Sequence, residues 1–177
     1  VNTQPKPKPC AQCGSIFTPV RPMMLVCSPL CASRLVKAAK KEEFARTKAR
    51  KVAIKSRADW AREAQTAFNA WVRARDADKP CISCERHHTG QYHAGHFLSR
   101  GARPELAYEP DNCHKQCAPC NTHLSGNVSM YRVNLVKLIG LERVEWLEGP
   151  HAAKHYSIED LREIKETYKR KLKEINQ

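Results

Sequence analysis

The chain has 177 residues, enough for one domain or two small ones. Its 31 Lys and Arg residues outnumber 18 Asp and Glu residues and give a formal net charge of +13, which favours a polyanionic partner, most simply nucleic acid. No run of about 18 apolar residues is present, and the N-terminus lacks the apolar core of a signal peptide. We therefore expect a cytoplasmic protein with no membrane partner.

The nine cysteines indicate metal binding, because eight stand in close pairs and a basic cytoplasmic chain does not keep disulfides. Pairs spaced C-x2-C or C-x3-C suit a tetrahedral zinc ion closed by four thiolates. The two predicted structural Zn²⁺ sites are Cys10, Cys13, Cys27 and Cys31, and Cys81, Cys84, Cys117 and Cys120. A redox C-x-x-C is the alternative for the first set, but no βαβ pattern surrounds it. The leftover Cys113 is interpreted as a buried small residue.

The N-terminal third is predicted to be mainly a basic helix. Residues 1–9 alternate Pro and Lys and predict a disordered arm, and Ser28-Pro29 is expected to open a short helix that carries Cys31. Residues 33–57 have a helical composition without Pro or Gly. This helix is either a solvated spacer or a rod laid along phosphates. The cations on it that we expect to contact DNA are Lys37, Lys40, Lys41, Arg46, Lys48, Arg50, Lys51, Lys55 and Arg57.

Apolar periodicity predicts packed helices on either side of the central block. A capping box at residues 56–59 starts one helix, whose aromatic stripe from Trp60 to Trp71 faces a core. Beyond Gly126 we expect a helix interrupted by Gly140, a short helix within LERVEWLEG, and a last helix after a second capping box at residues 157–160. The apolar stripe of that last helix either closes its own core or pairs with a second subunit.

The chemistry is expected between the second set of cysteines. Thr89-Gly90 marks the turn of a hairpin that carries the histidines, a loop follows, and the stretch from Asn112 through the second C-x-x-C is expected to lead into a helix. A hairpin, loop and helix clasped by zinc describe a treble-clef ββα-metal module. The order His96, Asn112, Asn121 is that of an HNH nuclease.

The expected fold class is therefore mainly α with small β-hairpins (α+β), built as a treble-clef ββα-metal (HNH) core with two four-cysteine zinc sites and long flanking helices. The expected segments are 1–32 for the N-terminal zinc element, 33–80 for the basic and packing helices, 81–127 for the nuclease-like core, and 128–177 for the C-terminal helices.

Each member of the HNH order has a physical role in phosphodiester hydrolysis. His96 is the predicted general base, since a neutral imidazole titrates near pH 6.5. Asn112 is predicted to hold the loop and orient His96, and Asn121 stands where a metal ligand is expected. One divalent cation, Mg²⁺ or Mn²⁺, would stabilise the charge that develops on the phosphate and on the departing oxygen.

The runs YHAGHFLSR, EPDNCHKQCAPCNTHLSGN and MYRVNLVKLIG resemble the phage NinG (Rap) recombination proteins, as do the first four-cysteine element and the last helix. The resemblance covers nearly the whole chain. It implies a structure-selective endonuclease that cuts branched DNA, including Holliday junctions and D-loops, in an infected bacterial host. We expect branched DNA, a second copy of the chain in a homodimer, and phage or host recombination proteins as partners.

One departure from the family pattern concerns the metal. The residue before the base is Gly95, which binds no cation, so His93 becomes the second predicted ligand. Residues three apart on a regular strand face opposite ways, so bringing His93 and His96 together needs a bulge or a turn at Ala94-Gly95, which the glycine permits. Imidazole in place of a carboxylate favours Mn²⁺, Ni²⁺ or another transition metal over Mg²⁺.

Weaker candidates surround this predicted centre. His114 and His123 are candidates for the cleft wall, and Arg100 and Arg103, in the loop after the base, are candidates for phosphate contact or for plain loop solvation. Two other functions stay open: a non-catalytic zinc-containing DNA-binding recombination mediator, and an RNA-binding or ribosome-associated zinc protein.

Overall fold

The computed structural model describes residues 5–21 and 23–177, and the chain divides into two compact units that meet between Lys55 and Ser56. It is mostly helical with two small antiparallel sheets, consistent with the expected α+β class. Within the described residues, no helix combines the length and apolarity needed to cross a membrane. Residues 1–4 of the expected disordered arm lie outside the described part, whereas β1 (Lys8–Pro9) is ordered and pairs with β2 (Ile16–Phe17).

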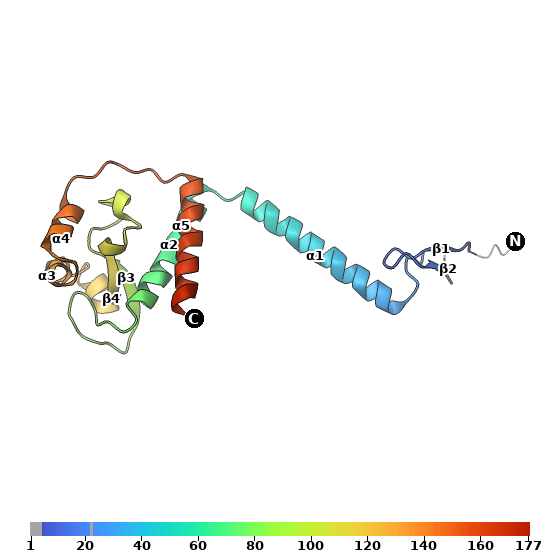
Figure 1. The fold of residues 1–177 in the computed structure, drawn as a ribbon, viewed down its shortest axis with the longest axis horizontal. Helices are drawn as coiled ribbons and strands as arrows, with labels where there is room; N and C mark the ends of the chain where they lie inside the picture. Colours follow the sequence, from blue (N-terminus) through green and yellow to red (C-terminus); the bar gives the residue numbers. More distant parts are fainter. Residues whose placement is uncertain (1–4, 22) are drawn as a thin grey trace. The chain divides into compact units, whose positions relative to one another are not determined.

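The first unit consists of the β1–β2 turn and the long helix α1 (Pro29–Ala53) (Figure 1). Ser28 caps the helix by accepting a hydrogen bond from the Cys31 N–H at 3.2 Å. Cys31 therefore lies in the first turn of the long helix, and the separate short helix expected there was wrong. The described part of α1 buries only Cys31, so the predicted basic helix is confirmed as an exposed one.

In the second unit, α2 (Arg57–Arg75) packs against α5 (Ile158–Ile175), and both predicted capping boxes are present. The α2 stripe forms the core with Leu161 and Tyr168 of α5, while Ile164 and Leu172 cover its edge. Phe68 lies at the centre, with its ring 4.8 Å from that of Tyr168. The apolar stripe of α5 therefore packs into the core of its own unit, as the first of the two alternatives predicted.

The second sheet joins β3 (Tyr92–His96) to β4 (Cys113–Cys117) in antiparallel register, with His96 opposite Cys113. Between them the chain makes two short turns, η1 (Pro104–Leu106) and η2 (Pro110–Asn112). The local hairpin expected at Thr89-Gly90 was therefore wrong. After the strand, the second C-x-x-C leads into the short helical turn η3 (Pro119–His123), as expected.

The strand β4 was missed because its polar residues are all buried. Lys115 donates to the Ala77 carbonyl at 2.7 Å, and Gln116 donates to the Ser83 hydroxyl at 2.6 Å. A sequence of such side chains carries no apolar alternation, although each is paired inside the fold.

The β3–β4 sheet lies between two helical layers, with α2 and α5 on one side and α3 (Val128–Ile139) and α4 (Leu141–Glu148) on the other (Figure 1). Ala94 and Cys113 face the α2–α5 core, while Tyr131 of α3 donates to the Gly95 carbonyl at 2.9 Å. The predicted break at Gly140 is confirmed, and its φ of 86° explains the glycine.

The bulge expected at Ala94-Gly95 is absent from the described strand pair, whose five residue pairs are consecutive. Glycine is needed at position 95 for a different reason. A Cβ added there would lie 2.2 Å from Gln116 Oε1 and 2.9 Å from Gln116 Cβ, and Gln116 is fully buried. Gly95 thus lets the Gln116 side chain of the neighbouring strand pack directly against the backbone of β3.

We expect Gly95→Ala to lower the free energy of unfolding by about 1–3 kcal/mol, the usual cost of overpacking a filled core. Urea denaturation followed by tryptophan fluorescence measures this loss. Gly90→Ala is the matched control, because a Cβ there meets nothing within 4 Å. Equal denaturation midpoints for the two variants would contradict the packing explanation.

Candidate functional site

The second four-cysteine cluster joins the ends of the central block. The Sγ atoms of Cys81, Cys84, Cys117 and Cys120 all lie within 4.8 Å of one another. The 3.9 Å separation between Cys84 Sγ and Cys117 Sγ fits a tetrahedral zinc ion, since Zn–S bonds of about 2.3 Å place sulfurs about 3.8 Å apart. The Cys117 N–H also donates to Cys81 Sγ at 3.3 Å, as thiolate ligands require. The donor set therefore fits zinc.

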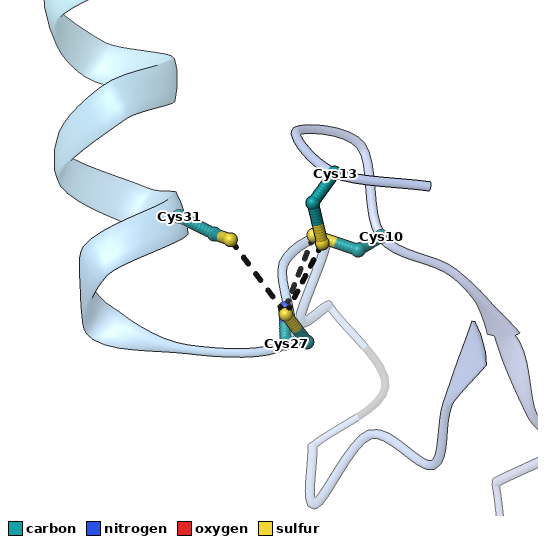
Figure 2. Close-up of side chains that lie close together, drawn as sticks. All are labelled: Cys10, Cys13, Cys27 and Cys31. Atoms are coloured by element: carbon teal, nitrogen blue, oxygen red, sulfur yellow. Dashed lines mark hydrogen bonds between the residues drawn. The ribbon is translucent and has the colours of Figure 1, made fainter. Parts of the chain in front are cut away.

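The first cluster has the same geometry in the first unit (Figure 2). Cys27 Sγ lies 3.6 Å from Cys13 Sγ and 3.7 Å from Cys31 Sγ, again close to a tetrahedral edge. The Cys27 N–H donates to Cys10 Sγ at 3.4 Å, and the four side chains converge from the N-terminal turn and the start of α1. Both clusters can thus hold a zinc ion.

Two hollows adjoin along β3, which in the described part of the chain pairs with β4 alone. The first has a volume of about 450 Å³ and is lined by Asn69, Arg73, Gln91, Tyr92, His93, Ala94 and Asn121. The second, of about 420 Å³, is lined by Asn69, Ala94, His96, Ser99, Arg100, Gly101, Asn121, Ser125 and Gly126. Because they share three residues, we treat them together as the edge cleft.

The edge cleft brings together three of the predicted site residues. His93 and His96 point to opposite faces of a regular strand, yet each reaches a hollow on the strand's open edge. Asn121 on η3 lines both hollows, and its Nδ2 lies 2.8 Å from His93 Nδ1. Asn121 therefore contacts His93 and also lines the hollow of His96, without a bulge in the strand.

His96 is held by its backbone neighbours. Its Nε2 lies 3.0 Å from the Ala107 carbonyl oxygen, so Nε2 carries the proton and donates, which leaves on Nδ1 a lone pair that lies 3.7 Å from the buried Cys113 Sγ. Burial lowers the pKa of His96 below 6.5; the hydrogen bond to Ala107 opposes this, and the positive charge of Arg100 adds to the lowering. The imidazole is therefore neutral near pH 7.

Asn112 is fully buried and fastens the loop that follows His96. Its Oδ1 accepts from the Leu98 N–H at 2.9 Å, and its Nδ2 donates to the Leu98 carbonyl at 3.0 Å and to the Leu106 carbonyl at 3.2 Å. These three bonds fix the path of the chain from β3 to Ala107, the residue that orients the imidazole of His96.

Other predicted site residues lie elsewhere. His114 was a candidate for the cleft wall, but it is buried against α3, 3.3 Å from the Tyr131 hydroxyl, and lines neither hollow. His123 is exposed and lines neither hollow. Arg103 pairs with Glu105 and donates to the Gly149 carbonyl at 2.7 Å, so it fastens the loop to the end of α4.

The cations of the predicted DNA-contacting helix are solvent-exposed from Lys37 to Lys51. Lys55 is half-buried, and Arg57 donates to the Tyr156 carbonyl at 3.4 Å. Arg100 lines the second hollow beside His96. These positions leave most of the expected phosphate contacts available.

Sequence patterns missed two groups of residues. Asn69 and Arg73 line the edge cleft from α2, and their four-residue spacing beside the core stripe was the signal that could have found them. The second is His88, whose Nε2 lies 3.2 Å from Cys84 Sγ and whose N–H donates to the Tyr92 hydroxyl at 2.6 Å. It adds a hydrogen-bond donor beside a zinc ligand.

A family model described as Bacteriophage Lambda NinG protein matches residues 2–177. The protein ninG of Escherichia phage lambda is 37% identical over 183 residues, covering 93% of this chain and 90% of that protein. The protein ninG of Salmonella phage P22 is 36% identical over the same coverage. The protein ninG of Escherichia phage 933W is 44% identical over 128 residues, and this chain spans only 64% of that relative's length. No solved structure matches the chain.

We expect two zinc ions per chain by atomic absorption, one in each cluster. Cys13→Ser and Cys117→Ser should each lose one ion, and only Cys117→Ser should abolish the near-UV dichroism of the aromatic core, because its cluster is buried in the second unit. Cys113→Ala is the matched control, since Cys113 is buried but belongs to neither cluster. A zinc content unchanged by Cys117→Ser would refute the second site.

Proposed function

The chain belongs to the NinG family of bacteriophage proteins, and from this premise we propose that it is a metal-dependent endonuclease of the HNH type acting on branched recombination DNA. One arrangement supports the proposal above all. A neutral imidazole, an imidazole–amide pair and two arginines line one cleft, and no carboxylate does so among the described residues. Such a cleft accepts a phosphodiester and offers a base beside it.

His96 acts as the general base. The Ala107 carbonyl holds the proton on Nε2, so the lone pair on Nδ1 would accept the proton of the attacking water in exchange for its 3.7 Å contact with the Cys113 thiol. The lowered pKa keeps the imidazole unprotonated at the pH of the cytoplasm. Asn112 contributes by position alone, since its three bonds hold the loop that carries Ala107.

His93 and Asn121 are the residues that would hold the divalent cation. Their contacting atoms are 2.8 Å apart, close to the spacing of about 3.0 Å between neighbouring ligands of an octahedral ion with bonds of about 2.1 Å. Turning the Asn121 amide presents Oδ1 instead of Nδ2 to that position. When bound, the cation would stabilise negative charge on the phosphate and on the departing 3′ oxygen.

The donor set also predicts how the cation is bound. Among the described residues, no Asp, Glu or Cys lines either hollow beside His93 and Asn121. Water and the phosphate must therefore complete the shell, so the cation and DNA bind cooperatively. An imidazole ligand favours Mn²⁺ over Mg²⁺.

The decisive assay compares cleavage of a synthetic four-way junction with cleavage of the matched linear duplex, in Mg²⁺ and in Mn²⁺. We expect the wild type to cut the junction and His96→Ala to lose at least about a hundredfold in rate, the usual contribution of a general base. Circular dichroism and zinc content check that the variant folds. If the wild type bound the junction but cut it in neither metal, the nuclease proposal would fail, and a non-catalytic DNA-binding recombination mediator would take its place.

The acid limb of the cleavage rate should lie below pH 6.5, because only neutral His96 can accept a proton and its pKa is lowered. Removing the Arg100 charge in Arg100→Gln should move the midpoint of that limb to higher pH, whatever it does to the maximal rate. The pH profile of kcat/KM at constant Mn²⁺ measures both, with zinc content checked at the lowest pH. If the midpoint of the acid limb were the same in Arg100→Gln as in the wild type, the assignment of His96 as the base would be contradicted.

A further inference from the structure

The helix α2 presents a polar row to the edge cleft. Gln65, Asn69 and Arg73 are spaced four residues apart and so share one side of the helix. Asn69 lines both hollows, and Arg73 lines the first hollow together with His93 and Asn121. This row lies beside the buried aromatic stripe that fixes α2 on the sheet, so its position relative to β3 is set by the core.

A hydrogen-bonded relay orients the amide of Asn69. Arg100 donates to Gln65 Oε1 at 3.1 Å, and Gln65 Nε2 donates to Asn69 Oδ1 at 2.7 Å. Because a guanidinium can only donate, the amide of Gln65 cannot be reversed without losing the first bond. Asn69 Oδ1 is thereby occupied, and its Nδ2 remains as a donor at the boundary of the two hollows.

Arg73 differs from Arg100, the other arginine that lines the edge cleft. Arg100 donates to Gln65, whereas within the described part of the chain no carboxylate or carbonyl bonds to Arg73, which is exposed. The cleft that it lines contains no acidic side chain among the same residues. An exposed guanidinium beside an N–H donor, with no competing anion, is suited to an external phosphate.

We propose that Asn69 and Arg73 bind the phosphate next to the scissile one, on the His93 side. This assignment rests on the proposed function, because it takes the phosphate between His96 and Asn121 as the one that is cut. One DNA strand then runs along α2, from Arg100 at the second hollow to Arg73 at the first hollow. Both contacts are to the backbone, so this subsite positions the strand and reads no base sequence.

The test measures binding of a four-way junction at several salt concentrations in a His96→Ala background, where no cutting interferes. Adding Arg73→Ala should weaken binding roughly ten- to a hundredfold at low salt. It should also reduce the slope of log K against log salt by about 0.9, as expected for one lost phosphate contact. Arg73→Lys should keep the slope. Arg62→Ala is the matched control on the same helix, since Arg62 pairs with Asp59 and lines neither hollow.

A second pair of variants tests the amide. Asn69→Asp replaces the donor by a carboxylate of the same shape, so it should weaken binding more than Asn69→Ala does. Equal effects of these two variants, or a salt slope for Arg73→Ala equal to that of Arg62→Ala, would overturn the subsite. A wild type that binds but never cuts would overturn the nuclease instead, while the salt slope would still report on Arg73.

Discussion

The pairing of β3 with β4 is the constraint on which the rest of the second unit depends. Cys117 ends β4 and is a ligand of the buried cluster, so a zinc ion there ties the strand to the knuckle at Cys81 and to the turn η3. At the other end, Asn112 fastens the connecting loop. With both ends fixed, the register of the strands is set, and His93 and His96 take their places along the open edge.

A buried charge network fixes the C-terminal end of α2, the helix that carries Asn69 and Arg73 of the edge cleft. Asp76, at the end of α2, is 1% exposed and accepts from Arg75, Lys79 and the Lys115 N–H. Burial raises the pKa of Asp76, but the hydrogen bonds and charges of Arg75 and Lys79 outweigh it and bring the pKa to about 2. A paired and fully bonded buried carboxylate restricts the ways in which α2 can dock. This network therefore helps to fix the position of the polar row of α2 (Gln65, Asn69 and Arg73).

Much of this fold follows from local signals in the sequence. The capping boxes before α2 and α5, the aromatic stripe of α2 and the spacing of the cysteines each depend on residues a few positions apart, and all of them are present. The same holds for the break at Gly140. Signals of this kind need no knowledge of distant neighbours.

The remaining features depend on partners far away in the chain. The strand β4 has no recognisable pattern, because Lys115 and Gln116 bond to groups elsewhere in the fold, such as the Ala77 carbonyl and the Ser83 hydroxyl, each more than 30 positions distant. Gly95 suggested a bulge but serves to accommodate Gln116 across the sheet. Asn69 and Arg73 acquire a role only when α2 is laid against β3. Each of these depends on tertiary packing, which a single sequence does not display.

The central claim is that one cleft holds the base, the cation and the phosphate together. The most direct measurement is an anomalous difference map of the His96→Ala protein crystallised with a four-way junction and Mn²⁺, recorded just above the manganese edge, where zinc scatters weakly. The account predicts one manganese peak between His93, Asn121 and a DNA phosphate. A bound junction with His93 and Asn121 still in contact with each other, and no manganese between them and the DNA, would contradict it.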